Sequence, residues 1–139
     1  MPEKLKVSAV LPASPKEVFE AWLDSKAHGS FTGGKAKIAP KVGGAFTAWD
    51  DYISGTTLSL EKHKRIVQSW RTAEFPDGSP DSELEVLLAP VKGGTKITLV
   101  HTEIPDGQAA QYKEGWIEYY FEPMKIYFSN AKTKSRRKK

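Results

Sequence analysis

The sequence of 139 residues contains no cysteine. This absence excludes disulfide bonds, thiolate metal ligands and a cysteine nucleophile. The chain also lacks an uncharged apolar run approaching the roughly 18 residues that a transmembrane helix needs. Its first residues, MPEKLKVSAV, lack the apolar stretch of a signal peptide. We therefore expect a cytoplasmic protein with no membrane span.

Motifs for catalysis, metals and cofactors are equally scarce. The three histidines (His28, His63 and His101) are far apart in the sequence, so a zinc site is not expected. The segment Gly29–Lys35 fits the pattern G-x-x-x-x-G-K, but a phosphate-binding loop needs a serine or threonine after the lysine and then a helix. Ala36 and a predicted strand follow instead. No Gly-x-Ser-x-Gly turn is present. We expect a non-enzymatic protein with no cofactor and no metal.

The net charge of +4 comes from the end of the chain. Six of the 21 basic residues lie in the last eight positions, which leaves 15 basic against 17 acidic residues in the remainder. A short basic tail is typical of a solvated segment, so no specific nucleic-acid partner is expected. We predict one domain over residues 1–131 and a disordered basic tail over residues 132–139.

The remainder is rich in apolar and aromatic residues, with four Trp, five Tyr and six Phe, which favours a globular domain. Lys4–Leu11 alternates apolar and polar residues, as a half-buried strand does. Ser14–Glu17 supplies a capping serine, a proline at the first helical position and a glutamate that can bond back to the cap. A second short helix begins after Asp24. Further strands are predicted at 36–39, 43–49, 53–60, 65–73, 83–88 and 96–104.

Beyond Gly107, aromatic residues recur at helical spacing and predict one long helix, which Pro123 should bend. Its apolar residues form two stripes, interpreted either as deep burial or as a second contact surface. One stripe contains Tyr112, Trp116, Tyr120 and Tyr127; the other contains Ile117, Phe121, Met124 and Phe128.

These elements predict an α+β fold. An antiparallel sheet of about six or seven strands would curve around the long C-terminal helix, with two short helices after the first strand. Strong curvature would leave an apolar cavity between sheet and helix. The residues expected to line it are Phe46, Ala48, Gln68, Trp70, Val86, Leu88, Leu99, His101, Trp116, Tyr120 and Met124.

Two polar residues on the inward strand faces need partners there. His101 follows Ile97 and Leu99 at two-residue spacing, and a buried histidine satisfied by its neighbours is favoured over a catalytic one. Gln68 shares a strand face with Trp70, where its amide must also find a hydrogen-bond partner.

Several short motifs carry a family resemblance over about residues 5–128. They are Ser14-Pro15-x-Glu17-x-Phe19, Gly43-Gly44-x-Phe46, Ser54-Gly55, Ile66-Val67-Gln68-x-Trp70-Arg71, Phe75-Pro76 and Gly115-Trp116-x-x-Tyr119-Tyr120-Phe121-Glu122. In this order they resemble the family of the activator of the heat-shock protein 90 ATPase, specifically its C-terminal type of domain, within the START-like (SRPBCC) superfamily. The resemblance implies a helix-grip fold with a cavity.

Three functions remain open. A binding protein that takes a hydrophobic small molecule or a protein partner is favoured, because aromatic residues are many and reactive groups are few. The family resemblance implies the alternative, a co-chaperone that binds the heat-shock protein 90 chaperone and stimulates its ATPase. A cyclase- or lyase-like enzyme rests on His101 alone.

Overall fold

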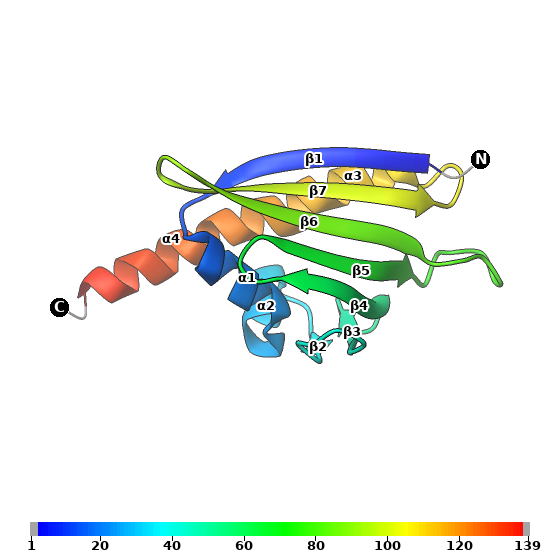
Figure 1. Cartoon of the computed structure of the whole chain (residues 1–139), viewed down its shortest axis with the longest axis horizontal. Coiled ribbons are helices and arrows are strands. Elements are labelled where there is room, and N and C mark those ends of the chain that lie inside the picture. Colours follow the sequence, from blue (N-terminus) through cyan, green and yellow to red (C-terminus); the bar gives the residue numbers. More distant parts are fainter. Residues whose placement is uncertain (1–2, 138–139) are drawn as a thin grey trace.

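A computed structural model describes the backbone of residues 3–137 and the side chains of residues 3–129. Seven antiparallel strands form one sheet in the order β1-β7-β6-β5-β4-β3-β2 (Figure 1). Only β1 is out of sequence order, because it pairs with β7 at the edge of the sheet. The strands are β1 (Glu3–Leu11), β2 (Lys37–Ile38), β3 (Ala45–Ala48), β4 (Ile53–Glu61), β5 (Arg65–Thr72), β6 (Ser82–Val91) and β7 (Gly94–Ile104).

Two short helices follow β1, and both begin as the sequence predicts. The helix α1 (Pro15–Leu23) has the predicted capping box, in which the Ser14 side chain and the Glu17 carboxylate each accept from the other residue's backbone N–H. The Asp24 side chain then caps α2 (Ser25–Thr32) by accepting from a backbone N–H of its first turn. Because α2 ends at Gly33 with φ at 84°, the chain can turn back toward the sheet.

A tight turn joins β6 to β7 in the interval between the predicted strands 83–88 and 96–104. Val91 pairs with Gly94, so the two-residue turn is Lys92-Gly93. Gly93 has a φ of 89°, the left-handed conformation that such a turn requires and that glycine adopts without strain. Gly94 already belongs to β7 and approaches the backbone of Leu11 closely.

The long C-terminal helix contains a π-helical turn, η1 (Ile117–Phe121), between α3 (Ala109–Trp116) and α4 (Glu122–Arg137). The Glu122 N–H donates to the carbonyl of Ile117, five residues back. A π-turn holds one residue more than an α-turn. The buried side chains before and within it are Tyr112, Trp116 and Tyr120, whereas those at its end and beyond are Phe121, Met124 and Phe128.

The extra residue therefore moves the buried face from one predicted stripe to the other. Tyr120 and Phe121 are adjacent and both buried, while Ile117 is 41% exposed. Neither stripe faces the sheet along its whole length.

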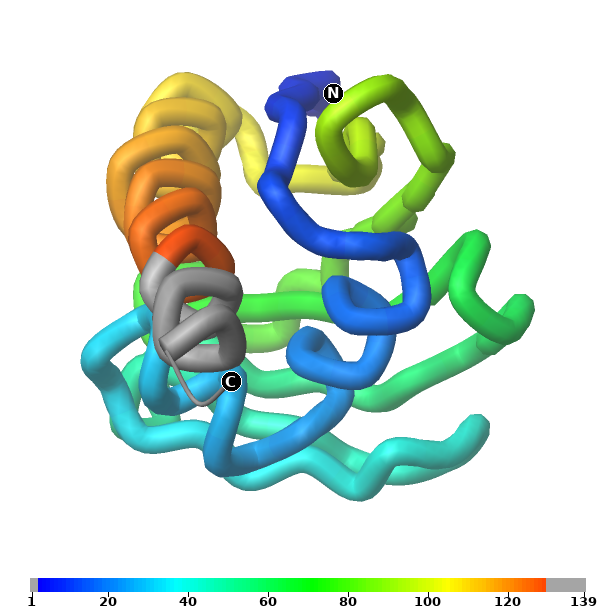
Figure 2. Tube along the Cα trace, turned by 90° about the vertical axis from the view of Figure 1, so that its left-hand side faces the viewer, coloured from blue at the N-terminus to red at the C-terminus, as the bar shows by residue number. Residues whose placement is uncertain are grey.

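The core lies between the inner face of the sheet and the helices. Figure 2 shows the sheet bending around one side of the long helix, as the predicted fold class requires. The structure thus confirms the α+β helix-grip architecture. The backbone of α4 continues to Arg137 and so enters the segment 132–139 that was expected to be a disordered tail; its side chains lie outside the described residues. Within residues 3–137, no helix is long and apolar enough to cross a membrane.

Candidate functional site

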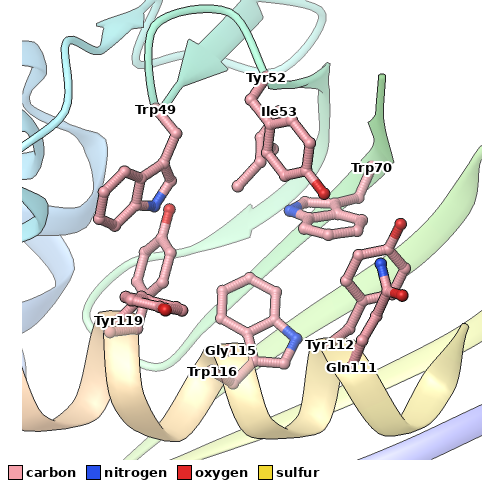
Figure 3. A pocket seen from close by; sticks show the side chains of 10 residues that line it. Trp49, Tyr52, Ile53, Trp70, Gln111, Tyr112, Gly115, Trp116 and Tyr119 are labelled. Atoms are coloured by element: carbon pink, nitrogen blue, oxygen red, sulfur yellow. The ribbon is translucent and has the colours of Figure 1, made fainter. Parts of the chain in front are cut away.

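An aromatic pocket lies between the long helix and the β3–β5 side of the sheet (Figure 3). It encloses about 360 Å³, within the size range of small-molecule sites. Seven of its ten lining residues are aromatic, and none carries a charge. The lining residues are Trp49, Tyr52, Ile53, Trp70, Gln111, Tyr112, Gly115, Trp116, Tyr119 and Tyr120.

A strained turn between β3 and β4 positions Trp49 at this pocket. Trp49, Asp50 and Asp51 have φ values of 53°, 56° and 73°, a left-handed run that L-residues rarely adopt. Two bonds hold it, because the Asp50 N–H donates to the Lys35 carbonyl at 3.0 Å and the Lys35 N–H donates to Asp50 Oδ1 at 3.1 Å. Gly34 lies directly against Trp49, where an added Cβ would come within 2.9 Å of the indole. Strain of this kind tends to occur at functional sites.

One wall of the pocket is fixed by a buried histidine, His28 of α2. Its Nδ1 lies 2.9 Å from the Trp22 carbonyl and so must carry the proton, which leaves Nε2 to accept from the Tyr120 hydroxyl at 2.8 Å. Burial lowers the pKa of His28 to about 4, although the carbonyl of Trp22 opposes the shift. Burial likewise raises the pKa of Tyr120. Both side chains are therefore neutral near pH 7, and the hydrogen bond between them holds the Tyr120 ring in place.

A second buried histidine, His101 of β7, lies behind Trp116. The Trp116 indole N–H donates to His101 Nδ1 at 3.2 Å, so the ring proton is on Nε2, which faces Ser82 Oγ at 2.8 Å. The Ser82 hydroxyl in turn donates to the Trp70 carbonyl at 2.7 Å. Burial lowers the pKa of His101 to about 3. The histidine is satisfied by its neighbours, the arrangement that its strand position favoured.

The contact between Ser82 and His101 has the distance of a nucleophile and its base, but its geometry is wrong for catalysis. A general base must accept the proton of the hydroxyl. Here the hydroxyl proton is directed at a backbone carbonyl, and the histidine donates to the oxygen. Neither residue lines the pocket, and both are at most 2% exposed.

The structure brings three of the predicted cavity residues, Trp70, Trp116 and Tyr120, into the pocket wall. The other eight lie in the core and do not line the pocket. They are Phe46, Ala48, Gln68, Val86, Leu88, Leu99, His101 and Met124. The physical reason is that strand alternation identifies which face points inward, while side chains of both layers fill most of the space there. Gln68 belongs to this interior, where it accepts from the Trp22 indole and donates to the Thr57 hydroxyl.

Sequence reasoning missed most of the wall. Three of the missed residues, Trp49, Tyr52 and Ile53, flank the acidic pair Asp50-Asp51 between two predicted strands. The other four lie on the long helix and are Gln111, Tyr112, Gly115 and Tyr119. The missed signal was the position of two aromatic residues on either side of Asp50-Asp51. His28 also had no detectable partner in the sequence, because Tyr120 is 92 positions away.

The glycine-rich segment 29–35 does not form a phosphate cradle. The backbone N–H groups of Gly33, Gly34 and Lys35 donate to protein oxygens of Gly29, Thr32 and Asp50, respectively. A phosphate loop needs such groups free to donate to the ligand. In the part of the chain that the structure describes, no cluster of three His, Asp or Glu residues is placed to hold a metal ion.

Comparison with known proteins identifies relatives over most of the chain. A human protein named activator of 90 kDa heat shock protein ATPase homolog 1 is 26% identical over 125 residues, which are 90% of this chain and 37% of that protein. A Dictyostelium discoideum homologue is 24% identical over 125 residues, covering 90% and 33%. The chain thus spans about a third of the length of these curated relatives.

Solved structures share the fold. An HSP90 activator from Plasmodium falciparum superposes with a TM-score of 0.82 at 23% identity, covering 88% of this chain and 94% of that one. CalU16 from Micromonospora echinospora gives a TM-score of 0.77 at 22% identity, covering 96% of this chain and 80% of that one.

A family model described as Activator of Hsp90 ATPase homolog 1-like protein matches residues 12–129. Because that match covers most of the chain, including the aromatic pocket and every strand except β1, this chain belongs to the family of Activator of Hsp90 ATPase homolog 1-like proteins.

Proposed function

We propose that this chain is a non-enzymatic binding protein whose partner is an Hsp90-type chaperone. The observation that carries the proposal is the family match over residues 12–129, together with relatives that are named activators of the 90 kDa heat-shock protein ATPase. The two buried histidines support a non-enzymatic role, because their ring nitrogens are already engaged in protein hydrogen bonds.

Calorimetric titration of the whole chain into the Hsp90 of the same organism tests this proposal. We expect saturable binding at a defined stoichiometry, and the ATPase rate of the chaperone measured in parallel reports whether binding also stimulates it. A variant lacking residues 132–139 is the control, since the six basic residues there attract acidic proteins without specificity. Binding that is absent at about 100 μM, or that disappears with the basic segment, contradicts the proposal.

A second candidate is binding of a small apolar molecule in the aromatic pocket. The pocket itself favours it, because about 360 Å³ of space is bounded mainly by rings and by few polar groups. Sites for small molecules have this composition. The two candidates are independent, since a chaperone partner requires no occupied pocket.

Thermal-shift and tryptophan-fluorescence titrations with a panel of lipids and flavonoids test the second candidate. A ligand that binds only the folded state raises the melting temperature with its concentration. Gly115→Leu would project a side chain from the helix into the pocket, and we expect it to abolish the shift while the fold remains. A ligand effect that survives in this variant would place binding elsewhere.

A further inference from the structure

The pocket is enclosed by ring systems from separate parts of the fold. Figure 3 shows Trp49 and Tyr52, from either end of the turn between β3 and β4, opposite Trp116 and Tyr119 of the long helix, with Trp70 of β5 closing another side. The face of an aromatic ring carries negative electrostatic potential and attracts cations, most strongly for tryptophan. No lysine or arginine lines this space.

Two of the polar groups on these rings are directed at the protein. The Trp116 indole N–H donates to His101, and the Tyr52 hydroxyl donates to the Glu74 carboxylate. These donors are therefore not offered to an anion or to a ligand rich in acceptors. Donation to a carboxylate also polarises the phenol and increases the electron density of its ring.

Acidic side chains outnumber basic ones on the chain segments that form most of the pocket wall, and none of them lines the pocket itself. The two stretches of chain that supply most of its wall, residues 49–53 and 111–120, also carry four exposed carboxylates but one lysine, Lys113. The carboxylates belong to Asp50, Asp51, Glu114 and Glu118. An excess of one sign of charge on nearby surface raises the local concentration of ligands of the opposite sign, without direct contact.

From this combination we infer that the pocket binds a quaternary ammonium cation attached to a small apolar body. A primary ammonium is strongly hydrated and needs several acceptors to replace its water. A trimethylated nitrogen spreads its charge over methyl groups, which can contact ring faces without hydrogen bonds. This inference rests on the second candidate function, binding of a small molecule in the pocket, and specifies the chemistry of that molecule.

Phenyltrimethylammonium and tert-butylbenzene form a matched probe pair, because they share their shape and differ in charge. Binding of each to the whole chain is measured by tryptophan fluorescence and by NMR shifts of the Trp49 and Trp70 indole N–H groups. We expect the cation to bind at least about tenfold more tightly. Its affinity should fall as salt is raised from 50 to 500 mM, because the nearby surface carboxylates are screened, whereas the neutral probe should not respond.

Tyr119→Leu removes one ring from the wall and keeps an apolar side chain. Tyr119 is 56% exposed, so the fold should tolerate the change. We expect it to weaken binding of the cation about three- to tenfold and binding of the neutral probe less than twofold. Tyr127→Leu is the matched control outside the pocket and should change neither affinity.

The possible outcomes distinguish failure of the ammonium inference from failure of the small-molecule function. Equal or tighter binding of tert-butylbenzene overturns the ammonium inference and leaves the pocket as an apolar site. Failure of phenyltrimethylammonium to bind at about 10 mM overturns it as well. Only failure of the lipid and flavonoid panel, in addition, would remove the small-molecule function.

Discussion

Gly115 is the most informative single position in the pocket wall. It lies inside a helix, where glycine is less favourable than alanine by about 1 kcal/mol. Its backbone does not require glycine, because its φ is not positive. Close packing does not require it either, since the atom nearest to an added Cβ would be Tyr119 Cδ2 at 3.9 Å, an ordinary van der Waals distance. What the missing side chain provides is open space on the pocket side of the helix.

Gly115→Ala should therefore stabilise the protein. The expected gain is about 0.8 to 1 kcal/mol from helix propensity and from the reduced freedom of the unfolded chain. For a chain of this size that corresponds to a melting temperature raised by about 3 to 5 °C. Gly29→Ala is the matched control, because Gly29 is also helical but an added Cβ would lie 3.2 Å from the Gly34 carbonyl oxygen. There the propensity gain is offset by crowding, and we expect no stabilisation.

Urea unfolding followed by tryptophan fluorescence, with a thermal melt by circular dichroism, measures both variants. A Gly115→Ala variant whose free energy of unfolding is lower by more than about 0.5 kcal/mol, an amount above ordinary surface effects, would contradict this prediction. Such a loss would mean that the space beside Gly115 is filled in solution. Equal gains in the two variants would mean that local propensity alone decides the result and that the pocket has no part in it.

Three further predictions follow from the buried groups and the C-terminal segment. Trp116→Phe removes the donor to His101 Nδ1 and should cost about 1 to 3 kcal/mol in urea unfolding, because a buried acceptor is left unpaired; a change below about 0.5 kcal/mol would contradict this. The folded-state pKa values of His28 and His101, about 4 and about 3, lie below the unfolded value of 6.5, so stability should be complete above pH 6.5 and decline as pH falls toward 4. At pH 5 each histidine should lower the free energy of unfolding by about 2 kcal/mol, and denaturation midpoints that do not differ between pH 7.5 and 5 would exclude this. Deletion of residues 132–139 should shift the thermal midpoint by less than about 2 °C, and a larger drop in calorimetry would mean that the segment is docked.

The order of elements could be predicted because local signals dictate it. The capping box at Ser14 and Glu17 sets where α1 begins, and two-residue alternation places His101 on the inner face of β7. Both signals act within a few residues of the chain. They therefore appear in the sequence without knowledge of the distant neighbours.

The pocket could not be placed in the same way, because its wall depends on contacts between distant segments. The turn at Trp49 owes its position to Lys35 and Gly34, and its indole meets Tyr119 edge-on with ring centroids 5.8 Å apart. The hydrogen-bond partner of His28 is likewise distant, since Tyr120 lies 92 positions away on the long helix. Periodicity gives the direction of a side chain, whereas a cavity depends on how far apart two layers are held.

The π-turn η1 depends on both local helix geometry and contacts between distant segments. In a regular α-helix adjacent residues point about 100° apart, so Tyr120 and Phe121 could not both face the core fully. The extra residue in η1 permits it: Tyr120 reaches His28 at 2.8 Å, Phe121 begins the buried face of α4, and Tyr119 is turned out to the mouth of the pocket at 56% exposure. A π-turn is rare. Here burial of the Tyr120 ring, which contributes about 2 kcal/mol, and its hydrogen bond to His28 favour it. The register of the long helix and the shape of the pocket are therefore a single structural property, which is why the two apolar stripes in the sequence could not be assigned to one face.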